Sequence, residues 1–411
     1  MKNKDIFVSK LLFFTMIGSI GSFASFINLH LEQVVGLSAS QIGFITFLGL
    51  ITTVVATPFW GYLSDKTGKH VALLKLLFLA VSGAGAIYYA SRTFALAIVG
   101  VILLESFRSS TNPLLDYIAT NYCAKYHYDF GKIRVAGSLG YLLIAMLTGF
   151  LVSGVDFNFF GVPVVLSGFM SISFAAFGVF IILNLLSLLL MFLLPTDTAS
   201  TKKEMGSPTA RFDRSDVVGL LKNKPFIFIL VLTMLGYMTV EAAFSFSTMH
   251  LVTILQARES IISWLAFFQV VPELLLLTFG SVFIKKMGVK NWYIFTMVTM
   301  CIRLTIYSFA TNPMLFVVGG TFHGIMMAMH IVGNISYIRK VVDAKVTALA
   351  FTILASTMAL SRGLLTVLFG FIYENIDSFM VFRVSLGIVL VALMITIFSK
   401  NLKIVGADLL N

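Results

Sequence analysis

Charged and polar side chains interrupt several long apolar stretches of this chain, and the stretch 94–120 carries the most of them. Four of them stand at i, i+3, i+7 and i+11, namely Glu105, Arg108, Asn112 and Asp116. One face of an α-helix would carry all four, and Pro113 is expected to bend the helix beside them. At the centre of a membrane such a charge costs roughly 2.5–3.5 kcal/mol, so this face must meet a cavity or a partner. Glu105 and Arg108 could act in transport, or they could equally only neutralise one another.

Titratable residues also lie in the later apolar stretches: Arg134, Glu241, Glu273, Arg303, His323, His330 and Arg362. Glu273 has apolar neighbours, which favour the neutral form of a carboxyl group, while a nearby Arg303 would favour its release of a proton. Glu273 is therefore the first candidate for a proton carrier. His323 and His330 are seven residues apart on one helix face. There they could relay a proton, donate hydrogen bonds to a solute, or only bond to neighbouring helices.

Composition places these groups in a membrane. The chain has 411 residues, of which 58% are hydrophobic and 11% charged, and its mean hydropathy is +0.97. Soluble domains carry about 25% charged residues, so most of this apolar surface must face lipid or other helices. The two cysteines, Cys123 and Cys301, suggest neither a disulfide framework nor a metal site. The sequence contains no HExxH or GxSxG motif, so it favours neither an enzyme nor a bound cofactor or metal.

Twelve apolar stretches are each long enough for a membrane-spanning helix of about 20 residues. They lie near 8–30, 40–63, 70–90, 94–120, 134–154, 162–194, 225–252, 260–284, 290–310, 313–338, 346–372 and 379–399. The stretch 162–194 exceeds one crossing, so its first turns are expected to tilt or to lie in the interface. A polar linker at 195–224 separates six helices in 1–194 from six in 225–411. The predicted fold is an all-α membrane protein made of two six-helix bundles.

Charge distribution predicts how these helices are oriented. Lysine and arginine residues cluster in alternate loops, including 66–75, 125–134 and 202–224, while the other loops hold few. Basic loops stay on the cytoplasmic side of a membrane, so both termini are expected in the cytoplasm. The net charge of +11 then reflects topology and gives no reason to expect a nucleic-acid partner. Short loops without a large soluble domain are what we expect of a bacterial inner-membrane carrier.

A short hydrophilic segment at 61–70 separates two of the apolar stretches. Its sequence, Gly-Tyr-Leu-Ser-Asp-Lys-Thr-Gly-Lys-His, resembles the characteristic loop of major facilitator superfamily transporters. The glycines would permit a sharp turn, the aspartate would cap or pair with a helix end, and the lysines would hold the loop in the cytoplasm. The residues expected to act in this loop are Gly61, Asp65, Lys66, Gly68 and Lys69. A weaker copy at 280–288, which lacks the acid, suggests a duplicated six-helix unit with pseudo-symmetric halves.

The segment from Asp116 to Arg134 resembles the hairpin between helices 4 and 5 of lactose-permease-type oligosaccharide:proton symporters. Both have an acid, an Asp-Phe-Gly-Lys-x-Arg type of turn, and the same separation between the acid and the last arginine. In that family the two charges form part of the sugar site, so the resemblance implies that Asp116 and Arg134 bind substrate. Tyr141 stands where the family has a tryptophan that stacks on the sugar, and it can still stack over a smaller area. Asn112, one turn before the acid, joins these substrate candidates.

Similarity to this family continues in the second half of the chain. Glu273, after Pro272, resembles the helix 8 glutamate that couples sugar to protons in that family. Arg303 and His323 resemble its functional arginine of helix 9 and its histidine of helix 10. We therefore expect proton coupling to involve Glu241, Glu273, Arg303, His323 and His330, and substrate binding to involve His323 and Arg362 as well.

Other charged positions of that family are absent. Gly320 and Met326 replace a lysine and a glutamate of helix 10, and this glutamate is the family's proton site. Leu276 replaces a sugar-binding asparagine, and Met358 replaces a lysine, although Arg362 could reach similar space. Lactose itself is therefore not the expected substrate. Wider relatives of the family include carriers for nucleosides and aromatic acids, which share parts of these motifs.

These patterns predict a secondary active transporter that works by alternating access and takes its energy from the proton gradient, without a bound cofactor. Proton-coupled uptake of a sugar or oligosaccharide is the first expectation. The alternatives are a proton-coupled carrier of nucleosides or aromatic acids, and a membrane sensor that binds sugar without moving it. The expected partners are a small-molecule substrate, protons and lipid. The expected state is a monomer in the plasma membrane, which is the inner membrane of a bacterium.

Overall fold

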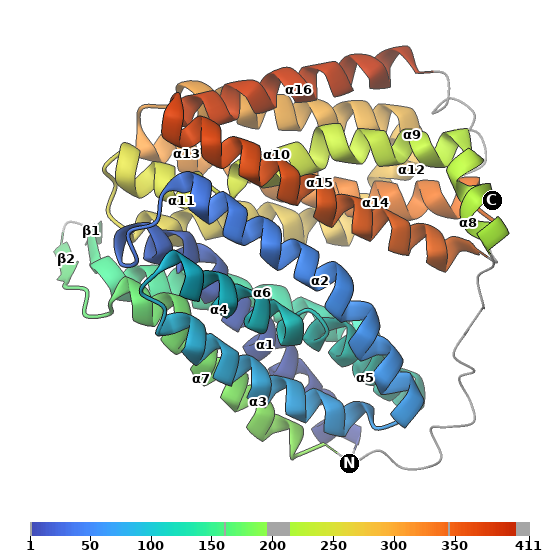
Figure 1. Ribbon diagram of the computed structural model, residues 1–411, viewed down its shortest axis with the longest axis horizontal. Helices are drawn as coiled ribbons and strands as arrows, with labels where there is room; N and C mark the ends of the chain where they lie inside the picture. Colours follow the sequence, from blue (N-terminus) through green and yellow to red (C-terminus); the bar gives the residue numbers. More distant parts are fainter. Residues whose placement is uncertain (1, 160–161, 195–213, 344–345, 400–411) are drawn as a thin grey trace. The chain divides into compact units, whose positions relative to one another are not determined.

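Two compact units make up the protein (Figure 1). The first comprises Met1–Thr209 with Arg258–Ala266, and the second comprises Ala210–Ala257 with Phe267–Asn411. The computed structural model describes residues 2–159, 162–194, 214–343 and 346–399. Most of the predicted linker lies outside the described residues, and its described part is helical.

The first unit consists of helices and one small hairpin. Its elements are α1 (Lys2–Gln33), α2 (Ala39–Thr67), α3 (His70–Tyr89), α4 (Phe94–Arg108), α5 (Thr111–Tyr126), α6 (Phe130–Ser153), β1 (Val155–Phe159), β2 (Val162–Leu166), the π-helical turn η1 (Phe174–Gly178) and α7 (Val179–Met191). Side chains cap the starts of several helices. Before α2, the Ser38 hydroxyl accepts a hydrogen bond from Gln41 N, and Ser38 N donates to Gln41 Oε1. Such caps satisfy N–H groups that the first turn leaves unpaired.

The membrane span formed by α4 and α5 is broken, where the sequence predicted one bent helix. α4 ends at Arg108 and α5 begins at Thr111. Pro113 has no N–H for the carbonyl four residues before it, and its ring collides with that carbonyl, so the helix stops ahead of the proline. Side chains replace two of the lost backbone bonds. Trp60 Nε1 donates to Ser106 O at 2.6 Å, and Thr111 Oγ1 donates to the last carbonyl of α4 at 2.8 Å.

A β-hairpin occupies the first part of the predicted helix at 162–194, so that prediction is wrong there. Val155–Phe159 and Val162–Leu166 pair as antiparallel strands. The helical part of the stretch starts only near η1. The segment Val-Pro-Val-Val-Leu is rich in β-branched residues, which favour an extended strand. Apolar composition alone did not separate this strand from a helix. Apart from this hairpin, the described residues form helices, turns and loops, and the predicted helical membrane fold is confirmed.

The second unit is helical in its described residues. Its elements are α8 (Arg214–Lys222), α9 (Lys224–Leu232), η3 (Thr233–Met238), α10 (Thr239–Phe244), α11 (Ser247–Met249), η4 (His250–Ile254), α12 (Ile261–Phe309), α13 (Pro313–Gly319), α14 (Thr321–Val341), α15 (Thr347–Asn375) and α16 (Ser378–Phe398), with the first residues of α12 belonging to the first unit. The π-helical turns η3 and η4 interrupt the first helical stretch of this unit. Such turns occur frequently at functional sites.

α12 contains the eighth and ninth predicted spans. Gly288 breaks it with φ of +75° and ψ of +159°, a conformation that residues with a Cβ rarely adopt. Where the sequence predicted a loop after the eighth span, the structure has a break in the helix at this glycine. The side chains of 280–286, which make up most of the weaker copy of the 61–70 segment, lie outside the described residues.

The turn between α2 and α3 is shorter than the sequence predicted. α2 continues to Thr67, so Gly61 lies inside the helix and does not form part of the turn. Only Gly68 adopts the left-handed conformation, with φ of +62°, and its N–H donates to Ser64 O at 2.9 Å. The charged residues of this segment are all exposed: Asp65, Lys66 and Lys69.

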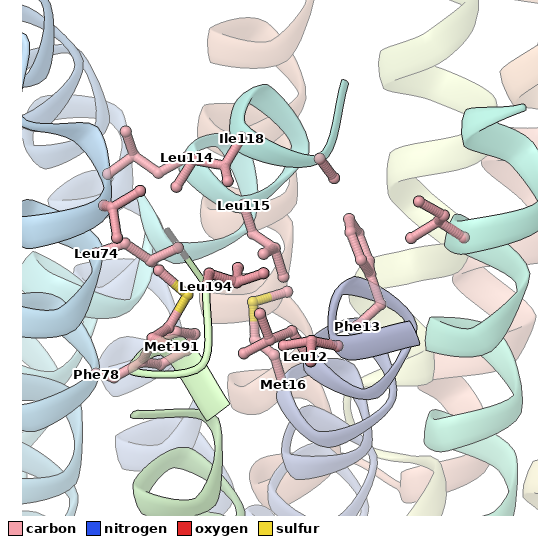
Figure 2. Close-up of a cluster of buried hydrophobic side chains, with 14 of the residues drawn as sticks. Leu12, Phe13, Met16, Leu74, Phe78, Leu114, Leu115, Ile118, Met191 and Leu194 are labelled. Carbon is pink, nitrogen blue, oxygen red and sulfur yellow. The ribbon is translucent and has the colours of Figure 1, made fainter. Parts of the chain in front are cut away.

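Buried apolar side chains from α1, α3, α5 and α7 form the core of the first unit (Figure 2). They include Leu12, Phe13, Met16, Leu74, Phe78, Leu114, Leu115, Ile118 and Met191. Lipid tails are as apolar as these side chains, so close packing rather than exclusion of water favours their association. Among the described residues, eleven helices are long and apolar enough to cross a membrane. The remaining predicted span coincides with the first part of α12, where Ile261–Leu276 is a shorter apolar helix.

Candidate functional site

Glu105 and Arg108 form a closed ion pair on α4. Arg108 Nε donates to Glu105 Oε1 at 3.0 Å, and Nη2 donates to Oε2 at 2.7 Å. Thr53 Oγ1 of α2 also donates to Glu105 Oε2, at 3.3 Å. The pair neutralises itself, which was one of the two outcomes that its spacing left open. The interruption at Ser109 and Ser110 separates this pair from Asn112 and Asp116 of α5.

Asp116 and Arg134 carry opposite charges on the hairpin of α5 and α6 without direct contact. Arg134 acts electrostatically on Asp116, but no nitrogen–oxygen distance of 4.0 Å or less joins these two described side chains. Asp116 Oδ1 and Asn112 Oδ1, one helical turn apart, are both buried, and neither has a hydrogen-bond partner among the described residues. The guanidinium carbon of Arg134 lies 5.5 Å from the ring centre of Phe13 in α1. Acceptors on α5 and a cation on α6 are therefore held near one another but unpaired.

Local bonds fix the hairpin that carries these groups. Asp129 Oδ1 accepts a hydrogen bond from Gly131 N at 2.8 Å and caps the start of α6. The Asp-Phe-Gly motif is therefore the cap of this helix. Tyr141 is half-buried farther along α6, where the backbone of α1 approaches it. A Cβ on Gly21 would lie only 2.6 Å from Tyr141 O, so these two helices are in backbone contact and hold the tyrosine on a rigid element.

Titratable side chains from four helices of the second unit meet in a group that we call the charged cluster. Its members are Glu241 of α10, Arg303 of α12, His323 of α14 and Arg362 of α15. Arg303 Nη1 donates to His323 Nδ1 at 2.8 Å, and that nitrogen lies 3.5 Å from Glu241 Oε1. Arg362 Nη1 lies 3.9 Å from Glu241 Oε2. The first three members are at most 9% exposed, so water screens their interactions little.

Arg303 is the most buried charge of this cluster, with no exposed surface. Its guanidinium carbon lies 4.9 Å from the ring centres of both Phe244 and Tyr307, whose faces attract a cation. The ring of Phe244 also stacks on His323 at 4.8 Å. Nε and Nη2 of Arg303 are buried and have no hydrogen-bond partner in the part of the chain that the structure describes. Buried donors are nearly always paired, so these two could receive oxygen atoms from a solute or from a carboxylate that moves.

Glu273 and His330 lie beside the charged cluster. The link is the buried Tyr237 of η3, which interacts electrostatically with Glu241, Arg362, Glu273 and Arg303. The ring of Tyr237 stacks on that of His330, with centres 3.9 Å apart. Asn334 Nδ2 lies 3.0 Å from His330 Nε2, and Tyr293 OH donates to Asn334 Oδ1 at 2.8 Å. The second unit thus brings all the predicted coupling residues into one neighbourhood.

The sequence relationship decides the family. Residues 7–384 match the MFS_1 like family. The chain belongs to this family of transporters. The predicted resemblance to the major facilitator superfamily is confirmed, and the protein is a secondary transporter rather than an enzyme.

Two relatives and one solved structure resemble this transporter. It is 26% identical to the uncharacterized transporter YwbF of Bacillus subtilis over 373 residues, which cover 90% of this chain and 86% of that protein. It is 29% identical to the maltose permease of Geobacillus stearothermophilus over 228 residues, or 56% of this chain and 52% of that permease. The nucleoside transporter NupG has the same fold, with a TM-score of 0.78 at 15% identity, over 96% of this chain and 99% of that structure.

Sequence reasoning missed a contact between the α2–α3 turn and the hairpin of α5 and α6. Ser64 Oγ lies 2.6 Å from His70 Nδ1 across the turn. The ring of His70 packs against Tyr117 at 4.5 Å, and Tyr117 is the neighbour of Asp116 in α5. Only tertiary packing brings α3 and α5 together, so the spacing within the segment 61–70 carried no signal of this contact.

Sequence reasoning also missed a matching group of three packed rings in each unit, and we call these two groups the aromatic boxes. The trios are His30–Phe177–Tyr88 and His250–Phe382–Tyr307. Both histidines are fully buried. The histidine and phenylalanine ring centres are 5.0 and 5.2 Å apart, and the phenylalanine and tyrosine centres 5.2 and 5.4 Å, all with edge-on geometry. The same construction therefore occurs in both halves of the transporter.

A sequence signal for these boxes existed. In both units a helix-capping residue follows the tyrosine after five positions and a glycine follows after twelve: Tyr88–Thr93–Gly100 and Tyr307–Asn312–Gly319. The tyrosine ring packs where the glycine lacks a Cβ, which would lie 2.6 Å from a ring atom in the first unit and 3.0 Å in the second. This repeat is a clearer trace of duplication than the copy of the loop segment.

Proposed function

We propose that this transporter takes up a sugar or oligosaccharide together with protons. The observation that carries the proposal is the half-buried Asp116, whose Oδ1 has no hydrogen-bond partner among the described residues, with the nearby cation of Arg134. A carboxylate and a guanidinium offer acceptors and donors to adjacent hydroxyl groups and carry no net charge together, which suits a neutral polyol. Asn112 would add an amide acceptor, and Tyr141 a stacking surface. The similarity to a protein named maltose permease supports this substrate class.

We assign proton coupling to the charged cluster and Glu273. The carboxylate of Glu241 lies between His323 on one side and Arg362 on the other. Protonation of a carboxylate here would remove its attraction for the cations on α12 and α15. A proton would thereby change which arrangement of helices is favoured, and substrate binding would add its own preference. His323, shared by an arginine and an acid, would contact both the substrate and the proton path.

A second candidate function is the transport of nucleosides or aromatic acids. The unpaired Nε and Nη2 of Arg303 favour it, because they could bind an anionic or carbonyl-bearing group between two aromatic rings. The third possibility, a sensor that binds sugar without transporting it, would keep the same side chains.

We further propose that the transporter is a monomer in the bacterial inner membrane, with both termini in the cytoplasm, energised by the proton gradient alone. The basic loops support this orientation. A cysteine in place of the exposed Asp343 tests it in a variant without Cys123 and Cys301. A membrane-impermeant thiol reagent should label it only from the cytoplasmic side. Labelling from outside would reverse the proposed topology.

The substrate is tested by uptake into proteoliposomes. We expect an inward proton gradient to drive accumulation of maltose or another oligosaccharide, and unlabelled oligosaccharide to compete. If nucleosides or aromatic acids accumulate and oligosaccharides do not, the second candidate function is correct. Counterflow exchange without a gradient separates transport from sensing, because a sensor binds labelled sugar but exchanges none.

A further inference from the structure

Two buried histidines of α14, His323 and His330, meet hydrogen-bond donors through different ring nitrogens. They lie seven residues, or about two helical turns, apart. His323 uses Nδ1, and His330 uses Nε2. A neutral imidazole carries its hydrogen on one nitrogen only, and the other nitrogen accepts. The partner of each ring therefore decides where its hydrogen is.

The hydrogen of His323 is determined by Arg303. A guanidinium has only donors and keeps its charge in proteins, so Nη1 must donate across the 2.8 Å contact and Nδ1 must accept. This leaves the hydrogen on Nε2. Glu241 agrees with the assignment, because its Oε1 lies 3.5 Å from the same Nδ1 and receives no hydrogen bond.

Two residues, acting one through the other, determine which ring nitrogen of His330 carries the hydrogen. Tyr293 OH donates to Asn334 Oδ1, which orients the side-chain amide of Asn334. The amide then presents Nδ2, a donor only, to His330 Nε2 at 3.0 Å. Nε2 must accept, so the hydrogen is on Nδ1. The stacked ring of Tyr237 covers this imidazole, and all four residues are buried.

We propose that Tyr293 and Asn334 are positioning residues that hold His330 as a neutral imidazole with its hydrogen on Nδ1, the opposite tautomer to His323. A second proton on His330 would have to enter at Nε2, where it would face the N–H of Asn334 in a buried site. His330 is therefore a fixed hydrogen-bond donor and does not carry the coupling proton. His323, by contrast, lies 3.5 Å from the carboxylate of Glu241, with which it can exchange a proton. The coupling part of this inference rests on the proposed function, and the tautomer part does not.

Nitrogen NMR of the full-length protein labelled in its six histidines tests the tautomers directly. Signals of the two rings are assigned by their loss in His323→Gln and His330→Gln. We expect a hydrogen on Nε2 of His323 and on Nδ1 of His330, with no imidazolium signal from His330 between about pH 5.5 and 8.5. A hydrogen on Nε2 of His330, or its protonation in this range, would overturn the proposal.

Substitutions of the positioning residues give a second readout. Tyr293→Phe removes the hydroxyl that orients the amide, so His330 should show both tautomers, with a population shift of about ten-fold for the loss of one buried hydrogen bond. Asn334→Asp replaces the donor by an acceptor and should move the hydrogen of His330 to Nε2. Tyr307→Phe is the matched control, because the buried hydroxyl of Tyr307 bonds to none of the described residues. If Tyr293→Phe leaves the tautomer of His330 unchanged, the positioning role is wrong.

Transport measurements test the coupling part of the inference separately from the proposed function. In proteoliposomes, His323→Gln should lower proton-driven accumulation at least about ten-fold more than His330→Gln does. If His330→Gln keeps counterflow but loses proton-driven accumulation, His330 carries the proton and the inference fails. If the unsubstituted protein shows no proton-driven accumulation, the proposed function fails, while the NMR result still decides the tautomers.

Discussion

The two units of the transporter differ in how their charged side chains are paired. In the first unit, Glu105 and Arg108 form a closed pair on a single helix, whereas Asp116 and Arg134 stay open, which means that they are not in contact. In the second unit the charges are connected, so that one histidine touches an arginine and lies beside an acid. Unpaired groups of opposite sign can bind a ligand, whereas connected groups can exchange partners when a proton arrives. In the proposed function, the first unit would therefore recognise the substrate and the second would couple its transport to protons.

The largest expected effect tests whether Asp116 and Arg134 act separately. Asp116→Asn or Arg134→Ala should weaken substrate binding about 100-fold or more, because each removes charged hydrogen bonds worth about 1.5–3 kcal/mol apiece. Because no ion pair joins the two side chains, the double variant Asp116→Asn/Arg134→Gln should bind no better than either single variant. Equilibrium binding in detergent measures this, and Asp343→Asn, at an exposed site, is the control.

Recovery of binding in the double variant would show that the two groups mainly neutralise one another. The first unit would then resemble the second, and the comparison would fail. Retained affinity in both single variants would remove the site assignment altogether.

The sequence predicted the parts of this arrangement that depend on composition and on charge spacing. Long apolar stretches located the helices, because a membrane leaves few other structures available. The resemblance placed Arg303 and His323 at positions that meet in the second unit. The breaks were harder to foresee. Pro113 indicated a bend but not that α4 would end five residues earlier, at Arg108, nor that Trp60 of another helix would bond to Ser106 O there.

Tertiary partners also explain what the sequence could not show at the site. Whether Arg108 pairs with Glu105 depends on side-chain rotamers, and both outcomes fitted the spacing. Asn334 and Tyr293 carry no charge and come from different helices, so no pattern linked them to His330. The strand at 162–166 shows the same limit for local structure, since apolar residues suit a buried strand as well as a helix.

Removal of the acid from the charged cluster should give the next largest effect. Glu241→Gln removes the carboxylate that lies beside His323 and Arg362, so a proton can no longer switch its attraction for Arg362. We expect proton-driven accumulation to fall about 30- to 100-fold, while counterflow falls only a few-fold. Glu374→Gln, at an exposed acid of the same unit, is the control. Equal loss of both activities would mean that the second unit also binds substrate through Glu241, which would weaken the division between recognition and coupling.

The closed pair of α4 should affect stability more than transport. Glu105→Gln leaves Arg108 without its two charged bonds, and we expect the free energy of unfolding to drop by about 1–2 kcal/mol, because Arg108 is partly exposed. The double variant Glu105→Gln/Arg108→Gln should lose less than the single variants together, since no unpaired charge remains. Thermal unfolding in detergent measures both, beside substrate binding. If Glu105→Gln instead abolishes binding at unchanged stability, the pair belongs to the substrate site and is not closed.

The smallest expected effect concerns Trp60 of α2, whose side chain donates a hydrogen bond to the interrupted span of α4 and α5. Trp60→Phe keeps the ring contact but removes the hydrogen bond to Ser106 O, so stability should fall by about 1 kcal/mol. Substrate affinity should fall by a few-fold, because the break sets where α5 carries Asp116. Trp264→Phe, at a ring that is 42% exposed in the same unit, should change neither quantity by as much. Loss of stability without any change in affinity would show that the break is only a packing feature, and that the open charges of the first unit are positioned by the hairpin alone.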